Sequence, residues 1–531
     1  DYMKRKKLYI TSGLLALLAI VGARKGYLLA ADPVEERKCD FNYPEGADES
    51  FIEIFEKDIS QSGLLVSQRG GTINDASCLN KTHVYAIARI NSEADIKNAL
   101  EFAELNNLEV TPAGVQHSMG GQSFVKGGLV LDMKGLNDIQ VNEENLTMRV
   151  QSGATWKQVQ EQLDPEGLAV KAMQSINLFS VGGTLSVNAH GIVHNPGQIA
   201  PTVRSMRVML SSGEIINTSP TENVELFGAV LGGYGLNGII LDVELDIVEN
   251  KVYEWKKEYM DYKEFSSYYQ ETVVGKDNVE FAYGRLSISP GSYLKELAMH
   301  RYETVEDNIE PQLLKPASKV WIKRFIFNFS KRGDLGRWTR WMAEKHLEPG
   351  VHQCISRNQL MAGQDEIACV ASRNEKMNQS MEYLEGRDKD TNILHEYFIP
   401  EENTTEFIDG LREIVQKTNA NLLNVTLRIV TKDEITALPY AKDDRIAFVL
   451  YFNQELNTED SKILQETTTE LIDLTTSLNG TFYLPYQLYY SDSQLRDAYP
   501  EVDDFFELKN KYDPQGLLSN SWYKKYGPKN Q

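Results

Sequence analysis

Cysteine is scarce in this chain of 531 residues. The four cysteines, Cys39, Cys78, Cys354 and Cys369, are widely spaced, and no two have the Cys-x-x-Cys spacing. That spacing is the usual mark of a zinc ribbon or a thioredoxin-like redox site, so both kinds of site are excluded. The count is compatible with one or two disulfides but does not require them.

The chain also lacks an excess of basic residues. It has 55 lysines and arginines against 76 acidic residues, which gives a formal net charge of −21. A surface with this balance repels polyanions, so we expect no nucleic acid partner. The composition, 41% hydrophobic and 25% charged, is typical of a soluble globular protein. The length exceeds that of one ordinary core and favours two domains.

The apolar run near the N-terminus is short for a membrane span. Residues 8–23 carry no charge, but a comfortable span needs about 20 apolar residues. The order Arg5-Lys6, Leu-Tyr-Ile, Thr-Ser-Gly resembles a twin-arginine export signal with Lys6 in place of the second arginine. We expect residues 1–30 to be a signal peptide or an uncleaved anchor. The protein would then be exported (periplasmic or extracytoplasmic, bacterial-type) or membrane-anchored.

A dinucleotide motif of the usual kind is missing as well. Gly233, Gly235 and Gly238 have the spacing Gly-x-Gly-x-x-Gly, but an apolar strand pattern at residues 239–245 follows them. The motif requires a helix at that place, so we reject a Rossmann site.

What the chain does have is three glycine-rich segments, at residues 111–127, 181–191 and 232–238. The first lies between two apolar runs with strand character, residues 108–111 and 129–133. Glycine-dense turns between strands bring several backbone N–H groups close to a ligand, which is how proteins hold a pyrophosphate. The alternative for the first segment is a surface turn with a chance histidine.

The order of these segments resembles the FAD-binding domain of the vanillyl-alcohol oxidase family. The resemblance rests on Ala-Gly-Val-Gln-His-Ser at 113–118, Val-Gly-Gly-Thr-Leu at 181–185 and the glycine-rich run at 226–240. Residues 511–520 are similar to the closing segment of alditol and aldonolactone oxidases. Tyr-Leu-Pro-Tyr at 483–486 is similar to the decaprenylphosphoryl-ribose oxidase group.

The resemblance implies an α+β fold: a PCMH-type FAD-binding domain of two subdomains and an α+β substrate (cap) domain with an antiparallel sheet. The FAD domain would span residues 81–250 and the cap 251–495. Residues 31–80 would be a linker and the N-terminal part of the FAD domain, and residues 496–531 would return to the FAD domain.

The resemblance also implies that FAD is the cofactor and that His117 carries it covalently on a flavin ring methyl. Gln116 stands where the family usually has a second glycine, and a non-covalent stacking or hydrogen-bonding role is the alternative for His117. The first segment would wrap the pyrophosphate, the second would lie against the flavin and ribityl chain, and the third would meet the adenosine. The implied cofactor-binding residues are Gly114, Val115, Gln116, His117, Ser118, Gly120, Gly121, Gln122, Ser152, Gly182, Gly183, Thr184, Asn188, Gly191, Gly238, Ile239 and Asn520.

Two histidines have the four-residue spacing of metal ligands on a helix. They are His190 and His194, but Gly191 and Pro196 would break such a helix, and no glutamate lies between the two. We therefore expect no metal, and we interpret both as polar lining of a loop near the flavin.

The strand pattern at residues 423–429 carries the catalytic candidates. Alternation places Thr426 and Arg428 on one face. In the sugar-alcohol and aldonolactone oxidases this strand reads Glu-x-Arg, so Arg428 matches and Thr426 replaces the glutamate. Tyr486 stands where the decaprenylphosphoryl-ribose group has a lysine. A guanidinium near the flavin would stabilise negative charge, and the alternative for Arg428 is a surface strand arginine.

A basic aromatic stretch at residues 315–345 contains Trp321, Trp338 and Trp341. It has two interpretations: a membrane- or lipid-facing lid, or a solvated helical face with buried tryptophans.

Together these features predict an FAD-dependent oxidoreductase. It would transfer a hydride from a hydroxyl-bearing carbon to flavin N5, with a small-molecule or lipid-linked sugar, polyol or lactone as substrate and oxygen or another molecule as acceptor. One alternative is a membrane-anchored dehydrogenase that passes electrons to a quinone or a partner protein. Another is a redox-silent binding module with the same fold.

Overall fold

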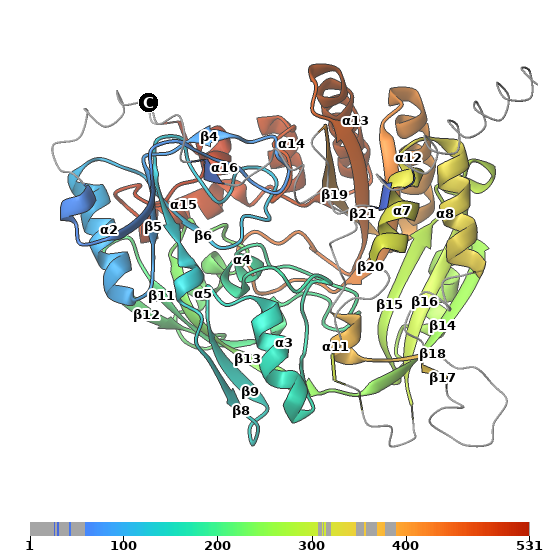
Figure 1. Ribbon diagram of the computed structural model, residues 1–531, viewed down its shortest axis with the longest axis horizontal. Helices are drawn as coiled ribbons and strands as arrows, with labels where there is room; N and C mark the ends of the chain where they lie inside the picture. The colour runs from blue at the N-terminus through green and yellow to red at the C-terminus, as the bar shows by residue number, and fades with distance from the viewer. Residues whose placement is uncertain are drawn as a thin grey trace, which may run out of the picture.

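The computed structural model describes residues 59–305, 320–346, 371–377 and 389–529, with short stretches at 26, 29–30, 42–43, 311, 313–314, 355–356 and 369–370. The signal or anchor expected at residues 1–30 therefore lies outside the described residues, apart from Gly26, Leu29 and Ala30. In Figure 1 the described chain forms two lobes, one blue to green on the left and one green to orange on the right. The α+β fold with an FAD-binding domain and an antiparallel cap sheet is confirmed.

The left lobe begins with a four-stranded sheet in the order β2-β5-β7-β6. Strands β5 and β6 both run parallel to β7, so the first glycine segment, which joins β6 to β7, crosses back over the sheet. Helix α2 (Glu93–Leu105) starts with a capping box between Ser92 and Asp95 and buries Ile96 and Phe102. The strands are β2 (Leu65–Arg69), β5 (Ala86–Arg89), β6 (Val110–Ala113) and β7 (Leu129–Asp132). A three-stranded sheet contains β1 (Asn42–Tyr43), β3 (Thr72–Ile73) and β4 (Thr82–His83).

A second sheet of the left lobe has the order β12-β11-β13-β9-β8, with β10 also paired to β13. All of its pairings are antiparallel. The third glycine segment leads directly into β13, as the sequence pattern predicts. The elements are β8 (Ile139–Asn142), β9 (Thr147–Gln151), α3 (Trp156–Leu163), β10 (Leu168–Val170), β11 (Val203–Met209), β12 (Ile215–Thr218), α5 (Val224–Val230) and β13 (Ile239–Glu249).

The second glycine segment differs from the loop that the sequence pattern predicts, because it begins as a short helix, α4 (Val181–Ser186). Two glycines make this a poor helix former. Burial overrides that preference: Val181 and Leu185 are fully buried, and the indole Nε1 of Trp156 donates to Thr184 Oγ1 at 2.8 Å. Tertiary packing therefore sets the conformation here.

The right lobe is built on a nine-stranded sheet in the order β17-β18-β14-β16-β15-β20-β21-β19-β22. Its pairings are all antiparallel. The strands are β14 (Val252–Asp261), β15 (Val279–Leu286), β16 (Glu296–Thr304), β17 (Ile355–Ser356), β18 (Cys369–Ser372), β19 (Asp390–Pro400), β20 (Asn421–Val430), β21 (Arg445–Glu455) and β22 (Thr481–Phe482).

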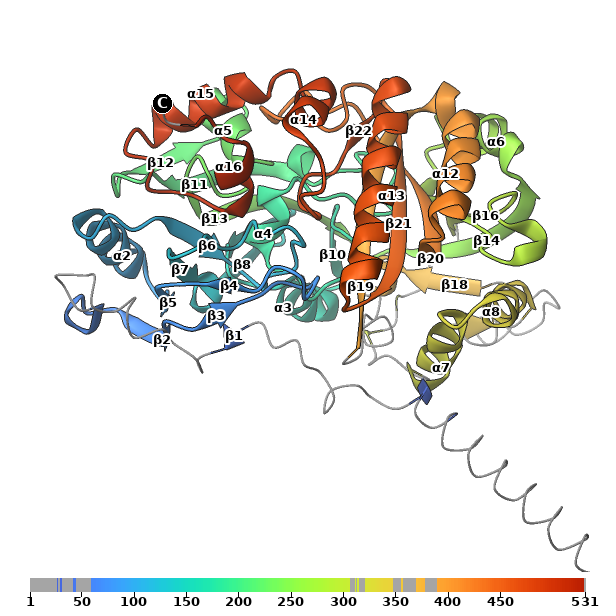
Figure 2. The same cartoon turned by 90° about the horizontal axis from the view of Figure 1, so that it is seen from above.

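Two long helices cover one face of this sheet. In Figure 2, α12 (Thr404–Thr418) and α13 (Thr458–Ser477) lie along its outer side. Strand β20 shows the consequence: Val425 and Leu427 are buried in the core with these helices, while Thr426 and Arg428 point to the opposite face. The alternation read from the sequence therefore holds. Short elements α6 (Phe265–Thr272) and α11 (Arg373–Lys376) also belong to this lobe.

The C-terminal segment runs back along the left lobe. The carbonyl of Leu517 accepts from the Val110 amide at 2.8 Å, and the Ser519 amide donates to the Val110 carbonyl at 2.9 Å, so the segment lies beside β6. A buried ion pair between Lys509 and Asp513 fixes the turn before it. The helices are α14 (Asp492–Ala498), α15 (Val502–Tyr512) and α16 (Ser521–Tyr526).

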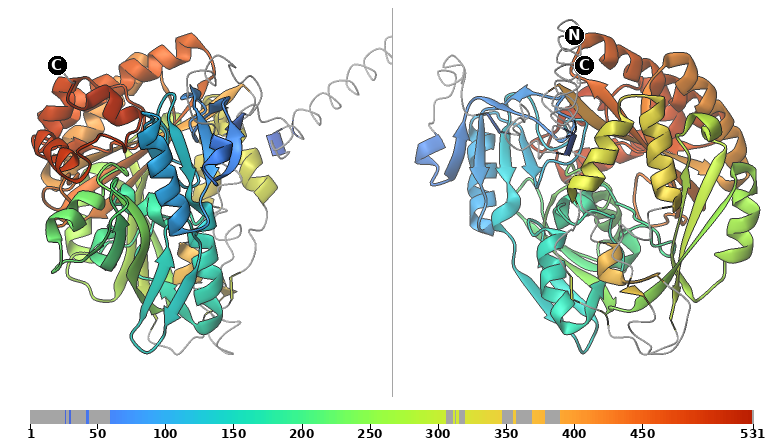
Figure 3. Two further views of the ribbon diagram at one scale, coloured as in Figure 1. Left: turned by 90° about the vertical axis from the view of Figure 1, so that its left-hand side faces the viewer. Right: turned by 45° about the vertical axis from the view of Figure 1, so that its right-hand side comes forward.

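Two helices of the right lobe form the basic aromatic stretch: α7 (Val320–Ser330) and α8 (Asp334–His346), yellow in the right-hand view of Figure 3. Trp321 and Trp338 are exposed, at 61% and 50% of their surface, whereas Trp341 is buried and donates to Glu296 at 2.7 Å. Each sequence interpretation thus fits part of the stretch. Within the described ranges, no helix is both long enough and apolar enough to cross a membrane.

Candidate functional site

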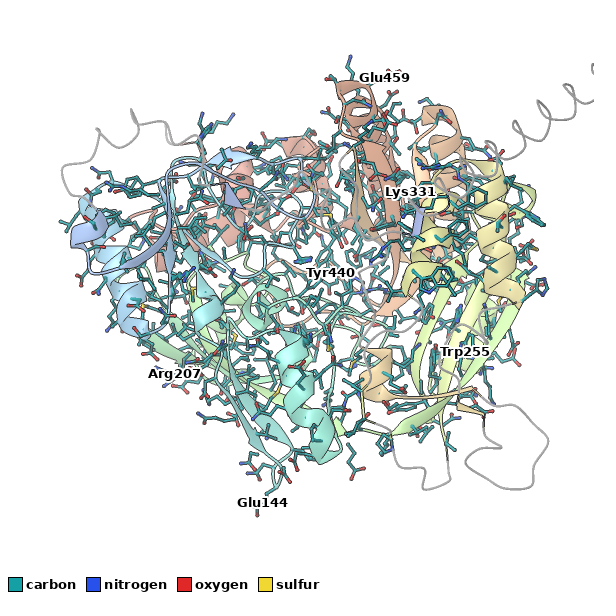
Figure 4. The ribbon with its side chains drawn as sticks, viewed as in Figure 1. Glu144, Arg207, Trp255, Lys331, Tyr440 and Glu459 are labelled. Atoms are coloured by element: carbon teal, nitrogen blue, oxygen red, sulfur yellow. The ribbon has the colours of Figure 1, made fainter. Side chains whose placement is uncertain are left out.

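A cavity of about 630 Å³ lies between the two lobes. The three glycine segments line one side, and the face of the cap sheet opposite α12 and α13 lines the other. Tyr440, labelled near the middle of Figure 4, marks the region between the lobes, and its hydroxyl donates to the carbonyl of Asn188 at 2.7 Å. The cavity therefore joins the two parts of the chain that carry the predicted cofactor and substrate residues.

The first glycine segment presents a neutral histidine to the cavity. His117 Nδ1 lies 3.0 Å from the carbonyl of Val115, which only accepts, so Nδ1 carries the proton and Nε2 a lone pair. Burial lowers the pKa of His117 to about 4, against a smaller opposing effect of the Val115 hydrogen bond. The ring packs on Phe179 with centroids 4.6 Å apart. At neutral pH the side chain is therefore an uncharged nucleophile.

Hydrogen bonds to backbone carbonyls position the two glutamine side chains near His117. Gln116 has the left-handed conformation, φ +56°, at the place where the family usually has glycine, and its amide donates to the carbonyl of Asn74 at 2.9 Å. Gln122 donates to the carbonyl of Leu484 at 2.8 Å and so ties the segment to the cap side. The predicted cofactor residues of this segment that line the cavity are Gly114, Val115, Gln116, His117, Ser118 and Gln122.

The cavity lining also contains hydrogen-bonding groups that have no partner within the described residues. A Cβ added to Gly183 would meet only Ser180 Oγ, at 3.0 Å. In the part of the chain that the structure describes, the buried hydroxyls of Ser123, Ser152 and Ser175 line the cavity and have no hydrogen-bond partner. Buried hydroxyls are normally satisfied, so these fit a ligand rich in hydrogen-bonding atoms, as the phosphates, ribityl chain and flavin of FAD are. Other predicted cofactor residues that line the cavity are Gly182, Thr184, Gly238 and Ile239.

Five predicted cofactor residues do not line the cavity. Asn188 donates to Asp433 at 3.0 Å, and Asn520 caps α16 while donating to the carbonyl of Tyr234 at 3.0 Å. The other three are Gly120, Gly121 and Gly191, which lie against other parts of the protein. A Cβ added to them would lie 2.2 Å from the Tyr486 carbonyl, 2.8 Å from Ser521 Oγ and 2.1 Å from the Met173 carbonyl, respectively. Their contacts support the cavity walls.

On the cap side, the sheet register aligns side chains from four strands. Arg285, Thr426, Val449 and Glu396 are direct cross-strand neighbours in one row. The next row, two residues along each strand, contains Arg428, and both rows face the cavity. Arg428 therefore lies inside the cavity, not on the outer surface, and within the described residues its buried Nε has no hydrogen-bond partner.

A buried acid–base cluster lies in this wall. One carboxylate oxygen of Glu396 is 2.5 Å from His190 Nε2, and the other accepts the hydroxyl of Tyr486. Burial raises the pKa of Glu396, but the charge and hydrogen bond of His190, together with Arg428 and Tyr486, outweigh it and leave the pKa below its ordinary value. Burial, reinforced by Glu396, raises the pKa of Tyr486 far above its ordinary value.

Sequence reasoning missed Glu396, although a signal was present. Together with His395 it interrupts the apolar strand pattern of residues 393–399, where a glutamate is unusual unless it has a partner. The two histidines at 190 and 194 turn to different partners, since His194 donates to the carbonyl of Val279 at 2.6 Å. No group of three or more metal-binding side chains occurs in the described part of the chain.

This fold and this cavity define a flavoprotein oxidoreductase with a PCMH-type FAD-binding domain. The family profile described as an FAD binding domain matches residues 84–219, and that of D-arabinono-1,4-lactone oxidase matches residues 243–526. The second match covers more than half of the chain, and the chain belongs to the D-arabinono-1,4-lactone oxidase family.

The individual proteins that are similar to this chain include cytokinin dehydrogenases and a decaprenylphosphoryl-ribose oxidase. Cytokinin dehydrogenase 2 of Arabidopsis thaliana is 29% identical over 208 residues, which are 38% of this chain and 41% of that protein. Decaprenylphosphoryl-beta-D-ribose oxidase of Mycolicibacterium smegmatis is 30% identical over 158 residues, 29% of this chain and 34% of that protein. Cytokinin dehydrogenase 3 of Arabidopsis thaliana is 22% identical over 438 residues, 79% and 81% of the two chains. The chain spans about two fifths of the length of the first of these relatives.

Proposed function

We propose that this FAD-dependent oxidoreductase oxidises a hydroxyl-bearing carbon of a sugar, polyol or lactone, either free or lipid-linked. The observation that carries the proposal is the cavity face of the cap sheet. There the buried Nε of Arg428 has no hydrogen-bond partner among the described residues, and Tyr486 and Glu396 lie on the same wall. A cation beside hydrogen-bonding oxygens suits a hydroxyl group and the negative charge that develops on its oxygen during oxidation.

The chain's own residues would divide the work. The segment at 114–122 would hold the FAD pyrophosphate, Gly182, Gly183 and Thr184 the flavin and ribityl chain, and Gly238 and Ile239 the adenosine. When bound, FAD supplies the hydride acceptor, N5 of the flavin ring. Arg428 would polarise the substrate oxygen, with Thr426 beside it as a second hydrogen-bonding group.

His117 would carry the FAD covalently. Its neutral imidazole with a lone pair on Nε2 is the form that attacks an electrophilic ring methyl. The alternative is a stacking or hydrogen-bonding contact without a bond.

The proposal is tested by purifying the protein, recording its visible spectrum and mixing it anaerobically with D-arabinono-1,4-lactone, xylitol and a polyprenylphosphoryl ribose. We expect a yellow protein whose flavin is bleached by at least one of these probes. A colourless folded protein would support the redox-silent binding module instead. A yellow protein that none of the three probes bleaches would contradict alcohol oxidation.

We propose oxygen as the acceptor and a location outside the cytoplasm, exported or anchored through residues 1–30. Cys78 is disulfide-bonded, which favours an oxidising compartment. The backbone of Leu29 accepts from Asn328 of α7 at 2.9 Å, so the chain that follows the apolar run reaches the helices that expose Trp321 and Trp338. If residues 1–30 anchor the protein, this contact would hold the exposed tryptophans near the membrane, as the second candidate, a membrane-anchored dehydrogenase that uses a quinone, requires.

Two measurements separate these candidates. Oxygen uptake equal to substrate turnover supports the oxidase, whereas dye or quinone reduction without oxygen uptake supports the dehydrogenase. Deleting residues 1–30 should leave a soluble, yellow protein in the cytoplasm. A truncated protein that does not fold would show that this segment belongs to the structure.

A further inference from the structure

We propose that Glu396 is the final acceptor of the substrate's hydroxyl proton, which reaches it through Tyr486, and that His190 positions its carboxylate. The inference rests on the proposed alcohol oxidation and adds the proton path to it. Thr426 has no carboxylate to accept a proton, but the sheet register puts Glu396 in the same cross-strand row, with Val449 between them.

Among the described residues, two carboxylates line the cavity, and their surroundings differ. Asp390 is paired with Lys331 at 2.9 Å, so its charge is already matched by a cation. Glu396 is held instead by hydrogen bonds from an imidazole and a phenol. It is therefore the cavity carboxylate able to take up a proton without breaking an ion pair with lysine or arginine.

The contacts fix the direction of every proton in the cluster. An ionised carboxylate only accepts hydrogen bonds, so both His190 Nε2 and the Tyr486 hydroxyl are donors. The buried His190 Nδ1 has no hydrogen-bond partner among the described residues. Tyr486 gives its proton to Glu396 and keeps its oxygen lone pairs for a donor in the cavity, such as a substrate hydroxyl.

Tyr486 accepts the substrate's hydroxyl proton on its oxygen while its own proton moves to the nearer oxygen of Glu396. The substrate C–H bond breaks, its hydrogen leaves with both electrons to the oxidised flavin, and the C–O bond becomes a carbonyl. Arg428 stabilises the oxygen during the transfer. Glu396 ends as a neutral acid that still accepts from His190.

The electrostatic surroundings of Glu396 keep its carboxylate ionised. The titratable and charged groups that face it from the packed elements are His190, Arg428, Tyr440, Tyr483 and Tyr486. Because the pKa of Glu396 lies below its ordinary value, the carboxylate is ionised throughout the range from about pH 6 to about pH 9. The relay therefore predicts a flat rate of flavin reduction over that range for the wild type.

The test compares wild-type holoenzyme with Glu396→Gln, Glu396→Asp and Tyr486→Phe in anaerobic stopped-flow flavin reduction. The matched control is Glu401→Gln, the same change just beyond the end of β19 and outside the cavity. The probes are D-arabinono-1,4-lactone, xylitol and a polyprenylphosphoryl ribose, tried in that order. A second readout needs no turnover: the dissociation constant of the probe for enzyme reduced beforehand with dithionite, measured by calorimetry.

We expect Glu396→Gln to reduce its flavin at least ~100-fold more slowly, in the range of a lost general base. Its rate should rise with pH as hydroxide replaces the carboxylate. Glu396→Asp should recover part of the rate, Tyr486→Phe should be ~10- to 100-fold slower, and the control should match wild type. Binding to reduced enzyme should change by less than about 3-fold, since the relay acts on transfer and not on uniform binding.

The outcomes distinguish a failure of the proton relay from a failure of the proposed alcohol oxidation. A Glu396→Gln enzyme with the wild-type rate and a flat pH profile would overturn the relay and leave alcohol oxidation standing. Equal losses in rate and in binding to reduced enzyme would also overturn it, because Glu396 would then be a binding group. A wild-type flavin that no probe reduces would contradict the proposed function itself.

Discussion

The covalent flavin linkage proposed at His117 gives a prediction whose size follows from the structure. Burial lowers the pKa of this imidazole to about 4, so about 90% of it is neutral at pH 5, compared with about 3% for an imidazole at its unperturbed pKa of about 6.5. Only the neutral form attacks the flavin. The sign is clear: a lowered pKa preserves the reactive form as the pH falls toward 4.

The assay reconstitutes apoprotein with FAD at pH 5 and pH 7 and follows in-gel flavin fluorescence after denaturing electrophoresis. The rates of bond formation at the two values of pH should be nearly equal, whereas an unperturbed histidine would be about 25-fold slower at pH 5. His117→Ala should still fold and bind FAD but give a dark band. The control, His83→Ala, changes an exposed histidine of β4 and should stay fluorescent.

Two results would refute the reasoning. A dark wild-type band from protein that was yellow before denaturation means that the FAD is held without a bond. A fluorescent wild-type band that forms about 25-fold more slowly at pH 5 means that the loop does not shield His117 in the way its burial indicates.

Three further predictions follow from single residues. Replacing Arg428 with Met should leave the flavin bound but slow its reduction by ~100- to 1,000-fold, the cost of losing one charge-stabilising donor, as stopped-flow would show. Gly114→Ala should lower the flavin content of purified protein, because the new Cβ would lie 2.0 Å from Ser180 Oγ on the facing wall; wild-type flavin content would contradict this. Asp513→Ala should lower the free energy of unfolding, measured by urea titration, by about 3–5 kcal/mol. The substitution leaves the buried Lys509 charge unpaired and removes the acceptor for the Leu517 and Leu518 amides. A loss below about 1 kcal/mol would show that Lys509 is neutral when buried.

Local pattern was enough to predict most of the secondary structure. The capping box at Ser92 and the spacing after it predict α2, and the period-two alternation of β20 places Thr426 and Arg428 on one face. The glycine segments predict close backbone approach, and Gly114 does lie against the opposite wall. These features depend on residues near one another in sequence, so the sequence by itself determines them.

Tertiary structure decided the rest. The α4 helix exists because burial of Val181 and Leu185 outweighs the poor helix propensity of its two glycines. The Glu396 cluster depends on β21 pairing with both β19 and β20, and on residues 190 and 486 meeting a side chain at 396. A local pattern of hydrophobic residues cannot predict these contacts, because strand register and lobe packing join residues that lie 90 and 206 positions apart along the chain.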